Sequence, residues 1–560
     1  MTNIEVAFVE STELQYLARL CAGIIVRWHH WKRHHYIRSQ RTAKYESARH
    51  WGINESNTIT KQDLTVKELI KESPVHQTML HKSIQTMPNT IRMLPRIPFR
   101  HLAIIMVMLW QNVNVLPPLA AESDESNQQP NILLIMADDL GWKDLNCQDN
   151  PKLKTPNLDK LASKGVRFTD AYAAAPVCSP TRAALITGLA PARLHITQHG
   201  PDGKSFWPDD RKVQPPPSSN ELSTEHFTLA EKLKAAGYST GFFGKWHLGN
   251  AKEFWPSHHG FDVNLGGCGF GGPPTYFDPY RIPTLPSRQP GEYLSDRLAE
   301  ETITYMRQNH KNPMFICLWT YNPHYPFEAP EELIDGFVGK EGRGLKNPIY
   351  GAQLEATDRA IGRVLNELEQ LRVSDKTLVI FTSDNGGWSG ATDNHPLRQG
   401  KGYLYEGGLR VPLIIHWPGH TKEGTTNSTP VISMDLTSTI LEATQDAPSP
   451  PTLEKGKTLD GVSLIPLLDG KSIERNELYF HYPHFAFHRS NRPGSAIRNG
   501  NYKLILNYDD SSTELYDLKK DISETNDLSK EKPELSRALL GSLNQWLDEV
   551  GADRPTPREN

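Results

Sequence analysis

Four short apolar runs, separated by amphipathic stretches, most constrain how this chain can fold. They cover residues 131–136, 240–243, 314–319 and 378–381. Continuous apolar runs of this length are typical of strands that are buried on both faces of a sheet. The amphipathic stretches between them, such as 157–164, 229–236 and 354–371, predict helices. The alternation predicts an α/β fold in which a large, mostly parallel β-sheet is sandwiched by helices.

The character of the sequence changes after about residue 470. Short strand-like runs separated by turns follow, and residues 534–550 are typical of a closing helix. A chain of 560 residues is long enough for several domains. We therefore expect a main domain over residues 128–470, which carries the chemistry, and a small C-terminal α+β domain over residues 471–550.

Residues 93–121 have the order of a secretory signal peptide. Arg96 and Arg100 precede the apolar stretch 102–110, and small residues end the segment at Ala121. The apolar stretch is shorter than the roughly 20 residues of a membrane-spanning helix, so we expect no stable membrane span. The segment predicts a protein that is secreted or periplasmic.

A signal peptide belongs at an N-terminus, yet this segment begins at Met93. We therefore expect Met93 to be the true start and residues 1–92 to be a non-structural extension. The alternative is that the histidines of this extension bind a metal; they are His29, His30, His34 and His35. A peptide from residues 1–92 in the natural protein would contradict our interpretation.

Charge and cysteine content argue against two classes of protein. The chain has 61 basic and 65 acidic residues, a formal net charge of -4, so its bulk charge gives no indication of nucleic-acid binding. Its five cysteines are far apart, odd in number and without CxxC spacing, which disfavours a disulfide framework. One cysteine with a chemical role fits this pattern better than five structural ones.

Polar side chains follow each of the four apolar runs. They are Asp138 and Asp139, Lys245 and His247, His324, and Asp384 and Asn385. Because ligands of open α/β sheets bind outside the carboxyl ends of the strands, we expect these groups to meet at one edge.

Four of these side chains offer oxygen ligands, namely Asp138, Asp139, Asp384 and Asn385. Carboxylate and amide oxygens select a hard cation, Ca²⁺ or alternatively Mg²⁺. The alternative reading is ordinary turn chemistry after a strand. Their occurrence as a pair at matching strand ends favours the metal.

Cys178 stands in the run Cys178-Ser179-Pro180-Thr181-Arg182, just before a predicted helix that ends at Gly188. A helix N-terminus is a natural anion site, and Arg182 offers a forked donor on its first turn. The alternative is a buried structural cysteine, which does not explain why Cys, Pro and Arg come together.

Four cationic candidates complete the expected pocket: Lys245, His247, His324 and Lys401. An anion pocket with a hard metal, several cations and one special cysteine suits hydrolysis of a sulfate or phosphate ester. In such a reaction the cations stabilise the negative charge that develops on the nonbridging and leaving oxygens of the ester.

These residues resemble the type I, formylglycine-dependent sulfatases of the alkaline-phosphatase superfamily, including the arylsulfatases. The run from Cys178 to Arg182 looks like their maturation signature, and residues 244–249 look like their second signature. Further likeness at residues 382–387 and 401–412 extends the resemblance over about residues 128–550.

The resemblance implies that a maturation enzyme oxidises Cys178 to formylglycine (3-oxoalanine). Ca²⁺ would then be held by that residue together with Asp138, Asp139, Asp384 and Asn385. One hydroxyl of the aldehyde hydrate would attack sulfur with help from Asp384, and His324 beside Lys401 would support the leaving alcohol.

The resemblance also implies roles for the remaining cations. His247 would take the proton that lets the sulfated intermediate collapse, while Arg182 and Lys245 would hold the charged hydrate. One departure is the glycine-rich segment 264–272, where many relatives carry a further polar residue. Backbone N–H groups or Cys268 would line the pocket there.

Two alternatives remain open at this point. A phosphodiester or phosphonate monoester hydrolase of the same superfamily would share the cysteine motif, and a non-catalytic sulfated-glycan binding protein would leave Cys178 unmodified.

The expected substrate is a sulfated small molecule or glycan. His484 and Arg489 lie in the run 481–489, which interleaves aromatic and cationic groups and is a candidate substrate-binding segment. The alternative is an exposed strand edge.

Overall fold

The computed structural model describes residues 129–200, 207–444, 458–488 and 490–558. All of them fall within one compact unit, Ala120–Asn560. The predicted extension 1–92, the predicted signal peptide 93–121 and the candidate residue Arg489 lie outside the described residues.

An eight-stranded sheet forms the centre of this unit, in the order β10-β2-β9-β8-β1-β7-β5-β6. Its strands are β1 (Asn131–Ala137), β2 (Val166–Phe168), β5 (Ser239–Gly244), β6 (Val263–Leu265), β7 (Met314–Trp319), β8 (Thr377–Ser383), β9 (Leu413–His416) and β10 (Thr425–Asn427). Only β9 runs antiparallel to its neighbours in this sheet. The prediction of a large, mostly parallel sheet is therefore confirmed.

Helices cover both faces of this sheet because the central strands are apolar throughout. In β1, Leu133 and Ile135 pack against helices of one layer, whereas Ile132 and Leu134 pack against the other. The first layer holds α4 (Pro156–Lys164), α8 (Leu294–Asn309) and α10 (Pro348–Gln370). The second holds α5 (Cys178–Thr187), α7 (Leu229–Ala235), α12 (Met434–Ala443) and α13 (Ile465–Leu468). This is the sandwich that the alternating pattern predicts.

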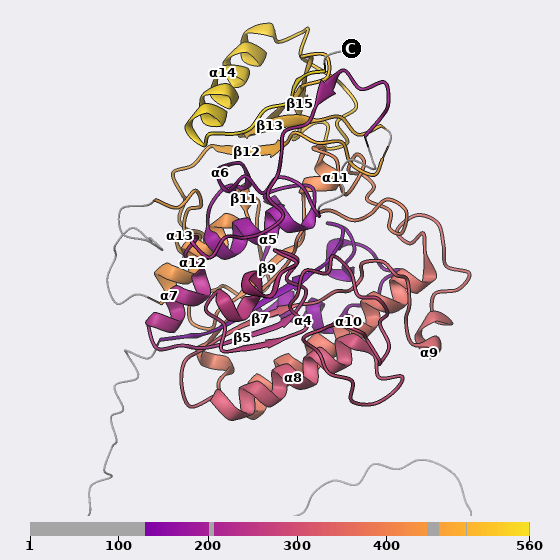
Figure 1. The fold of residues 1–560 in the computed structure, drawn as a ribbon, viewed down its shortest axis with the longest axis vertical. Coiled ribbons are helices and arrows are strands. Elements are labelled where there is room, and N and C mark those ends of the chain that lie inside the picture. The colour runs from indigo at the N-terminus through magenta and orange to yellow at the C-terminus, as the bar shows by residue number, and fades with distance from the viewer. Residues whose placement is uncertain (1–128, 201–206, 445–457, 489, 559–560) are drawn as a thin grey trace, which may run out of the picture. The chain divides into compact units, whose positions relative to one another are not determined.

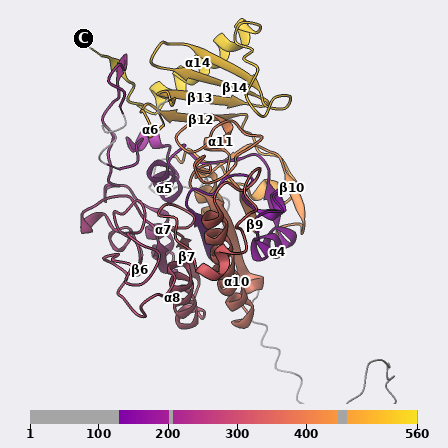
Figure 2. The ribbon, with the colours of Figure 1, turned by 90° about the vertical axis from the view of Figure 1, so that its right-hand side faces the viewer.

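A small antiparallel sheet with one covering helix forms the C-terminal part of the chain, drawn in yellow at one end of the ribbon (Figures 1 and 2). Its elements are β12 (Glu477–Tyr482), β13 (Gly494–Asn499), β14 (Tyr502–Asn507), β15 (Thr513–Asp517) and α14 (Pro533–Glu549). Leu504 on one face packs under Leu543 of α14. Ile505 on the other face belongs to the same buried core as Val177, the residue before Cys178.

The remaining elements are short. They are β3 (Ala171–Tyr172), α6 (Pro191–Leu194), β4 (Val213–Gln214), α9 (Glu331–Ile334), α11 (Glu406–Leu409), β11 (Val431–Ile432) and β16 (Thr556–Pro557), with single 3-10 turns at 146–148, 252–254, 256–258 and 374–376.

Two further findings bear on the class of protein. Across the described ranges, no helix has both the length and the apolar character that a membrane crossing would need. The four cysteines in these ranges, Cys147, Cys178, Cys268 and Cys317, are all free thiols.

Candidate active site

The four central strands, β8, β1, β7 and β5, deliver their polar ends to one edge of the sheet. Met136 lies in register with both Thr382 and Trp319, and Trp319 lies in register with Gly244. Each strand ends at almost the same level, so the residues that follow it converge. This is the arrangement that the four apolar runs predict.

Helix α5 brings Cys178 to the same edge. Cys178 is the first residue of α5, rather than the residue before it as the sequence predicted, and Gly188 ends the helix in the left-handed conformation with φ 68°. Arg182 lies one turn further on the same face of the helix. Its Nε and Nη2 donate to Asp384 Oδ2 at 2.9 and 2.7 Å, and its Nη1 donates to the Lys245 carbonyl at 2.6 Å.

Three buried carboxylates face three buried cations at this edge. Besides the pair of Arg182 with Asp384, Lys245 Nζ lies 2.6 Å from Asp138 Oδ2, and Lys401 Nζ lies 2.6 Å from Asp139 Oδ1. Burial would raise the pKa of Asp139, but the Lys401 ammonium lowers it below its usual range. Burial and the neighbouring Asp384 carboxylate raise the pKa of Asp138 to about 8. Asp138 therefore lies where additional positive charge would be stabilising.

The donor set fits a hard divalent cation. Asp138 Oδ1 and Asn385 Oδ1 are buried oxygens without a hydrogen-bond donor, although a buried polar atom normally has a partner. Asn385 Nδ2 donates to Asp139 Oδ1 at 2.8 Å. Ligand atoms of Asp138, Asp139 and His324 all lie within 4.8 Å of one another. The carboxylates of Asp138 and Asp139, together with the unsatisfied oxygens of Asp138 and Asn385, are ligands of the kind that Ca²⁺ or Mg²⁺ would bind.

His247 approaches the cysteine directly. Its Nδ1 lies 3.3 Å from Cys178 Sγ, and its backbone adopts φ 61°. Burial and the nearby Lys245 ammonium hold the pKa of His247 well below its usual range. Gly271 lies against the other side of the ring, because a Cβ added there would come within 2.8 Å of Nε2. Neutral His247 could therefore accept a proton beside Cys178.

His324 lies across the pocket from His247. Its Nδ1–H donates to the Tyr325 carbonyl at 2.6 Å, which leaves Nε2 unprotonated, 3.7 Å from Asp139 Oδ2. Burial and the Lys401 ammonium lower the pKa of His324 to about 3. In this state His324 is neutral.

These residues surround a cavity of about 790 Å³. Its lining comprises Asp139, Cys178, His199, His247, Gly271, His324, Tyr325, Trp388, Ser389, Gly390, Lys401, Phe487 and His488. The structure thus brings Cys178 together with His247, His324 and Lys401, all of which the sequence predicts for this site.

Sequence reasoning missed five aromatic or imidazole side chains of this lining: His199, Tyr325, Trp388, Phe487 and His488. Phe487 and His488 belong to the run 481–489, the predicted substrate-binding segment, and Tyr325 directly follows His324. His199 has no motif of its own that could have indicated it.

Two expected residues lie elsewhere. His484 is buried, its Nε2 lies 2.8 Å from Thr197 Oγ1, and it lines a separate cavity of about 440 Å³ together with Trp207. Cys268 is buried with its Sγ 4.0 Å from Tyr321 Oη, while Gly271 lines the pocket. Of the two alternatives for the glycine-rich segment, the structure favours backbone lining.

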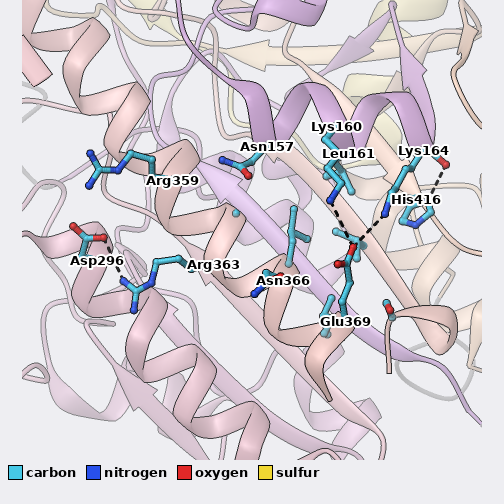
Figure 3. A pocket seen from close by; sticks show the side chains of 15 residues that line it. Asn157, Lys160, Leu161, Lys164, Asp296, Arg359, Arg363, Asn366, Glu369 and His416 are labelled. Atoms are coloured by element: carbon cyan, nitrogen blue, oxygen red, sulfur yellow. Dashed lines mark hydrogen bonds and ion pairs between the residues drawn. The ribbon is translucent and has the colours of Figure 1, made fainter. Parts of the chain in front are cut away.

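A second groove of about 550 Å³ lies between α4 and α10 (Figure 3). Three of its four Lys and Arg side chains pair with its own carboxylates: Lys160 and Lys164 face Glu369, and Arg363 faces Asp296. Its lining contains no cysteine and no group of carboxylates that could share a metal. The Cys178 cavity is therefore the candidate active site.

Comparisons with known proteins agree with this site. The Sulfatase family model matches residues 130–447, and the model "N-sulphoglucosamine sulphohydrolase, C-terminal" matches residues 398–551. Human arylsulfatase A is 36% identical over 417 residues, which cover 67% of this chain and 74% of that protein. Human N-acetylgalactosamine-6-sulfatase is 33% identical over 380 residues, which cover 63% of this chain and 68% of that protein. A sulfatase of Formosa agariphila is 32% identical over 517 residues (77% and 92%).

Solved structures show the same likeness. The crystal structure of Ps i-CgsB in complex with k-i-k-neocarrahexaose matches with a TM-score of 0.65 and 29% identity, over 75% of this chain and 93% of that chain. The phosphonate monoester hydrolase of Agrobacterium radiobacter, 21% identical with a TM-score of 0.57 over 77% of this chain and 100% of that one, shares the fold. The Sulfatase model covers more than half of the chain, and the arylsulfatase A match covers two thirds of it. This chain therefore belongs to the sulfatase family of the alkaline-phosphatase superfamily, and it is a sulfuric ester hydrolase.

Proposed function

We propose that this sulfatase removes sulfate from a sulfated carbohydrate, with a nucleophile made from Cys178. The observation that carries the proposal is the position of Cys178 at the start of α5, inside a cavity that also holds His247, His324 and Lys401. The names of two similar proteins support a carbohydrate, because one is an N-acetylgalactosamine-6-sulfatase and the other binds a neocarrahexaose.

Two groups complete the site in this proposal. A maturation enzyme would convert Cys178 to formylglycine, whose hydrate would supply the two hydroxyls that attack on sulfur and release of the sulfate require. Calcium, or alternatively magnesium, would be held by that residue with Asp138, Asp139, Asp384 and Asn385, and it would supply positive charge for the sulfate oxygens.

The chain's own residues then hold and move protons. Arg182 fixes Asp384 through two hydrogen bonds, and Lys245 fixes Asp138. Neutral His247, 3.3 Å from Cys178 Sγ, accepts a proton from the nucleophile residue.

Protonation of the leaving oxygen falls to His324 with Lys401 beside it. The Lys401 ammonium helps to lower the pKa of His324. A bound sulfate group would offset that charge, and so favour the protonated imidazole that an acid catalyst requires. The negative charge of the substrate would thus raise the pKa of His324 and favour the protonated form that can act as an acid.

The proposed site of action is outside the cytoplasm, after export by residues 93–121. N-terminal sequencing of the natural protein tests this directly. A mature N-terminus shortly after Ala121 is expected, and an N-terminus within residues 1–92 would contradict it.

The test of the function compares matched aryl sulfate and aryl phosphate esters. The enzyme, co-produced with a formylglycine-generating enzyme, should hydrolyse the sulfate with the higher kcat/KM, and Cys178→Ala should abolish this turnover. A clear preference for the phosphate would replace the proposal with a phosphoester or phosphonate hydrolase. Tight binding of sulfated glycans by a protein with unmodified Cys178 and no turnover would replace it with a binding protein.

A further inference from the structure

Three large apolar side chains are strongly exposed in the part of the chain that the structure describes. They are Phe270, Tyr325 and Val338, with exposed fractions of 36%, 62% and 59%. One of them, Tyr325, lines the Cys178 cavity, whereas Phe270 only precedes the lining residue Gly271 in the sequence. Val338 lies after α9 and does not line it. Exposed aromatic side chains at the rim of a cavity are typical of a surface that receives a ligand.

Tyr325 is the outer member of an aromatic row that leads inward. Its ring meets the edge of Phe327 at 5.9 Å between centroids, and Phe327 stacks on Trp388 at 5.6 Å with an interplanar angle of 9°. Trp388 itself lines the cavity. Packing against Phe327 restrains the Tyr325 ring even though most of its surface remains open.

The segment that carries Phe270 is held against the same rim. A Cβ added at Gly272 would lie 2.8 Å from the Tyr325 carbonyl and 2.9 Å from His324 Nδ1. The backbone at Gly272 is therefore in close contact with the Tyr325 backbone, and this contact holds the glycine-rich segment beside the cavity.

The cavity changes in character from its inner to its outer end. The inner end holds the Asp139–Lys401 ion pair, Cys178 and the two catalytic histidine candidates, whereas Tyr325 adds an exposed aromatic ring. A volume of about 790 Å³ lies high in the range of roughly 300–1,000 Å³ for small-molecule sites. There is room for more than one ring beside the sulfate group.

We propose that Tyr325 is a stacking platform for a second sugar ring next to the one that carries the scissile sulfate. The inference rests on the proposed function and narrows the range of substrates. The enzyme should act better on sulfated oligosaccharides than on sulfated monosaccharides. Sugar rings have apolar C–H faces, and covering such a face with an aromatic ring removes apolar surface from water.

The experiment compares Tyr325→Ala with wild type on matched probes. These are the 6-sulfates of galactose, N-acetylgalactosamine and N-acetylglucosamine, each paired with a tetrasaccharide that ends in the same sulfated residue, and 4-nitrophenyl sulfate as the reference. Wild type should prefer the tetrasaccharide in at least one pair. In that pair, Tyr325→Ala should lower the tetrasaccharide-to-reference ratio of kcat/KM roughly tenfold, mainly through KM.

Two variants make the result specific. Tyr325→Trp retains an aromatic face and should restore most of the lost ratio. Val338→Ala removes an equally exposed apolar side chain away from the cavity, and its ratio should equal that of wild type.

The proposal is overturned if no pair shows a preference for the tetrasaccharide, or if Tyr325→Ala leaves that preference intact. An equal loss of kcat/KM on the monosaccharides, the tetrasaccharides and 4-nitrophenyl sulfate would also overturn the proposal. Tyr325 would then only position its neighbour His324 and would not bind a second sugar ring. Failure of the proposed function is distinguishable, since wild type would then not hydrolyse the reference sulfate at all or would prefer an aryl phosphate.

Discussion

At the scale of single residues, Arg182 connects the parts of the active site. It is completely buried, and its three donors reach Asp384 after β8 and the Lys245 carbonyl after β5. A lysine could not replace it, because only the planar guanidinium can donate to both groups from one position. Arg182 therefore fixes two strand ends and the start of α5 relative to one another.

We predict that Arg182→Gln destabilises the protein by about 3–5 kcal/mol, because it leaves the buried Asp384 carboxylate without its charge partner. Arg193→Gln is the matched control, since Arg193 forms a forked pair with Asp460 but is 40% exposed. Its cost should stay below about 1 kcal/mol. Urea unfolding of the three proteins measures both values, and equal losses would contradict this view of Arg182.

The proposed catalytic residues of the cavity could be predicted from the sequence, whereas several other residues that line it could not. Cys178 and His247 stand in compact motifs at strand or helix ends, where the topology alone determines where they meet. Tyr325, Trp388 and His199 lie on loops whose paths depend on packing between segments far apart in the chain. His484 shows the same limit, because its motif was visible but the side chain points to a different cavity.

At the scale of elements, α5 depends on the way it ends. Gly188 adopts φ 68°, and a Cβ there would lie 2.9 Å from Leu459 Cδ2. Only glycine combines the left-handed backbone with this close approach at low cost. Gly188, at the C-terminal end of α5, therefore helps to fix the helix that carries Cys178 and Arg182 at its N-terminal end.

Replacing Gly188 by alanine should destabilise the protein by about 1–3 kcal/mol through backbone strain and the contact with Leu459. Gly541→Ala is the opposite case, because Gly541 lies within α14 and nothing lies within 4 Å of the added Cβ. That variant should gain about 0.5–1 kcal/mol. Thermal unfolding separates the two, and a loss of similar size in both would contradict the argument.

Most helices and strands could be predicted because each has one clear pattern of apolar residues along its whole length. The run 314–319 is a strand of that extent, and 131–136 and 378–381 differ from β1 and β8 by only a few residues. Strand β13 was missed, since its sequence GSAIRN has neither an apolar run nor clean alternation. Its place between β12 and β14 comes from pairing that only the assembled sheet supplies.

At the scale of the whole molecule, a buried charge cluster joins the small C-terminal sheet to the main sheet region. Lys503 of β14 lies 3.0 Å from Glu406 of α11 and 2.9 Å from Glu524. All three side chains are buried. Two carboxylates thus share one ammonium group, and one of them retains a proton more readily than usual.

This cluster predicts a pH dependence of stability. Burial raises the pKa of Glu524 to about 7, and the neighbouring Glu406 adds to the shift against the opposing effect of Lys503. A carboxyl whose folded pKa is raised contributes most below its unfolded pKa, and this contribution is lost as the pH rises through about 7.

Glu524→Gln should therefore remove part of the fall in stability between pH 5 and pH 8. Relative to the variant, wild type should lose about 1–3 kcal/mol over this interval. Urea unfolding at both pH values measures the difference, with the exposed Glu549→Gln as the control. Parallel pH curves for wild type and Glu524→Gln would contradict the assignment.

Removing the metal should affect the whole molecule as well as its activity. Dialysis against a chelator should abolish turnover and lower Tm, because a bound cation stabilises only the folded protein. Calcium should restore both more fully than magnesium does. Asp138→Asn removes one of the carboxylates that we propose as ligands, so the Tm of this variant should respond much less to calcium. An unchanged response would exclude Asp138 as a ligand.

The most direct test of this account is the mass of the peptide that contains Cys178, measured on the natural, catalytically active enzyme. The account predicts an aldehyde in place of the thiol, with the mass of formylglycine and reactivity towards a hydroxylamine reagent. A peptide that retains an unmodified cysteine, in a preparation that hydrolyses aryl sulfates at its full rate, would contradict it.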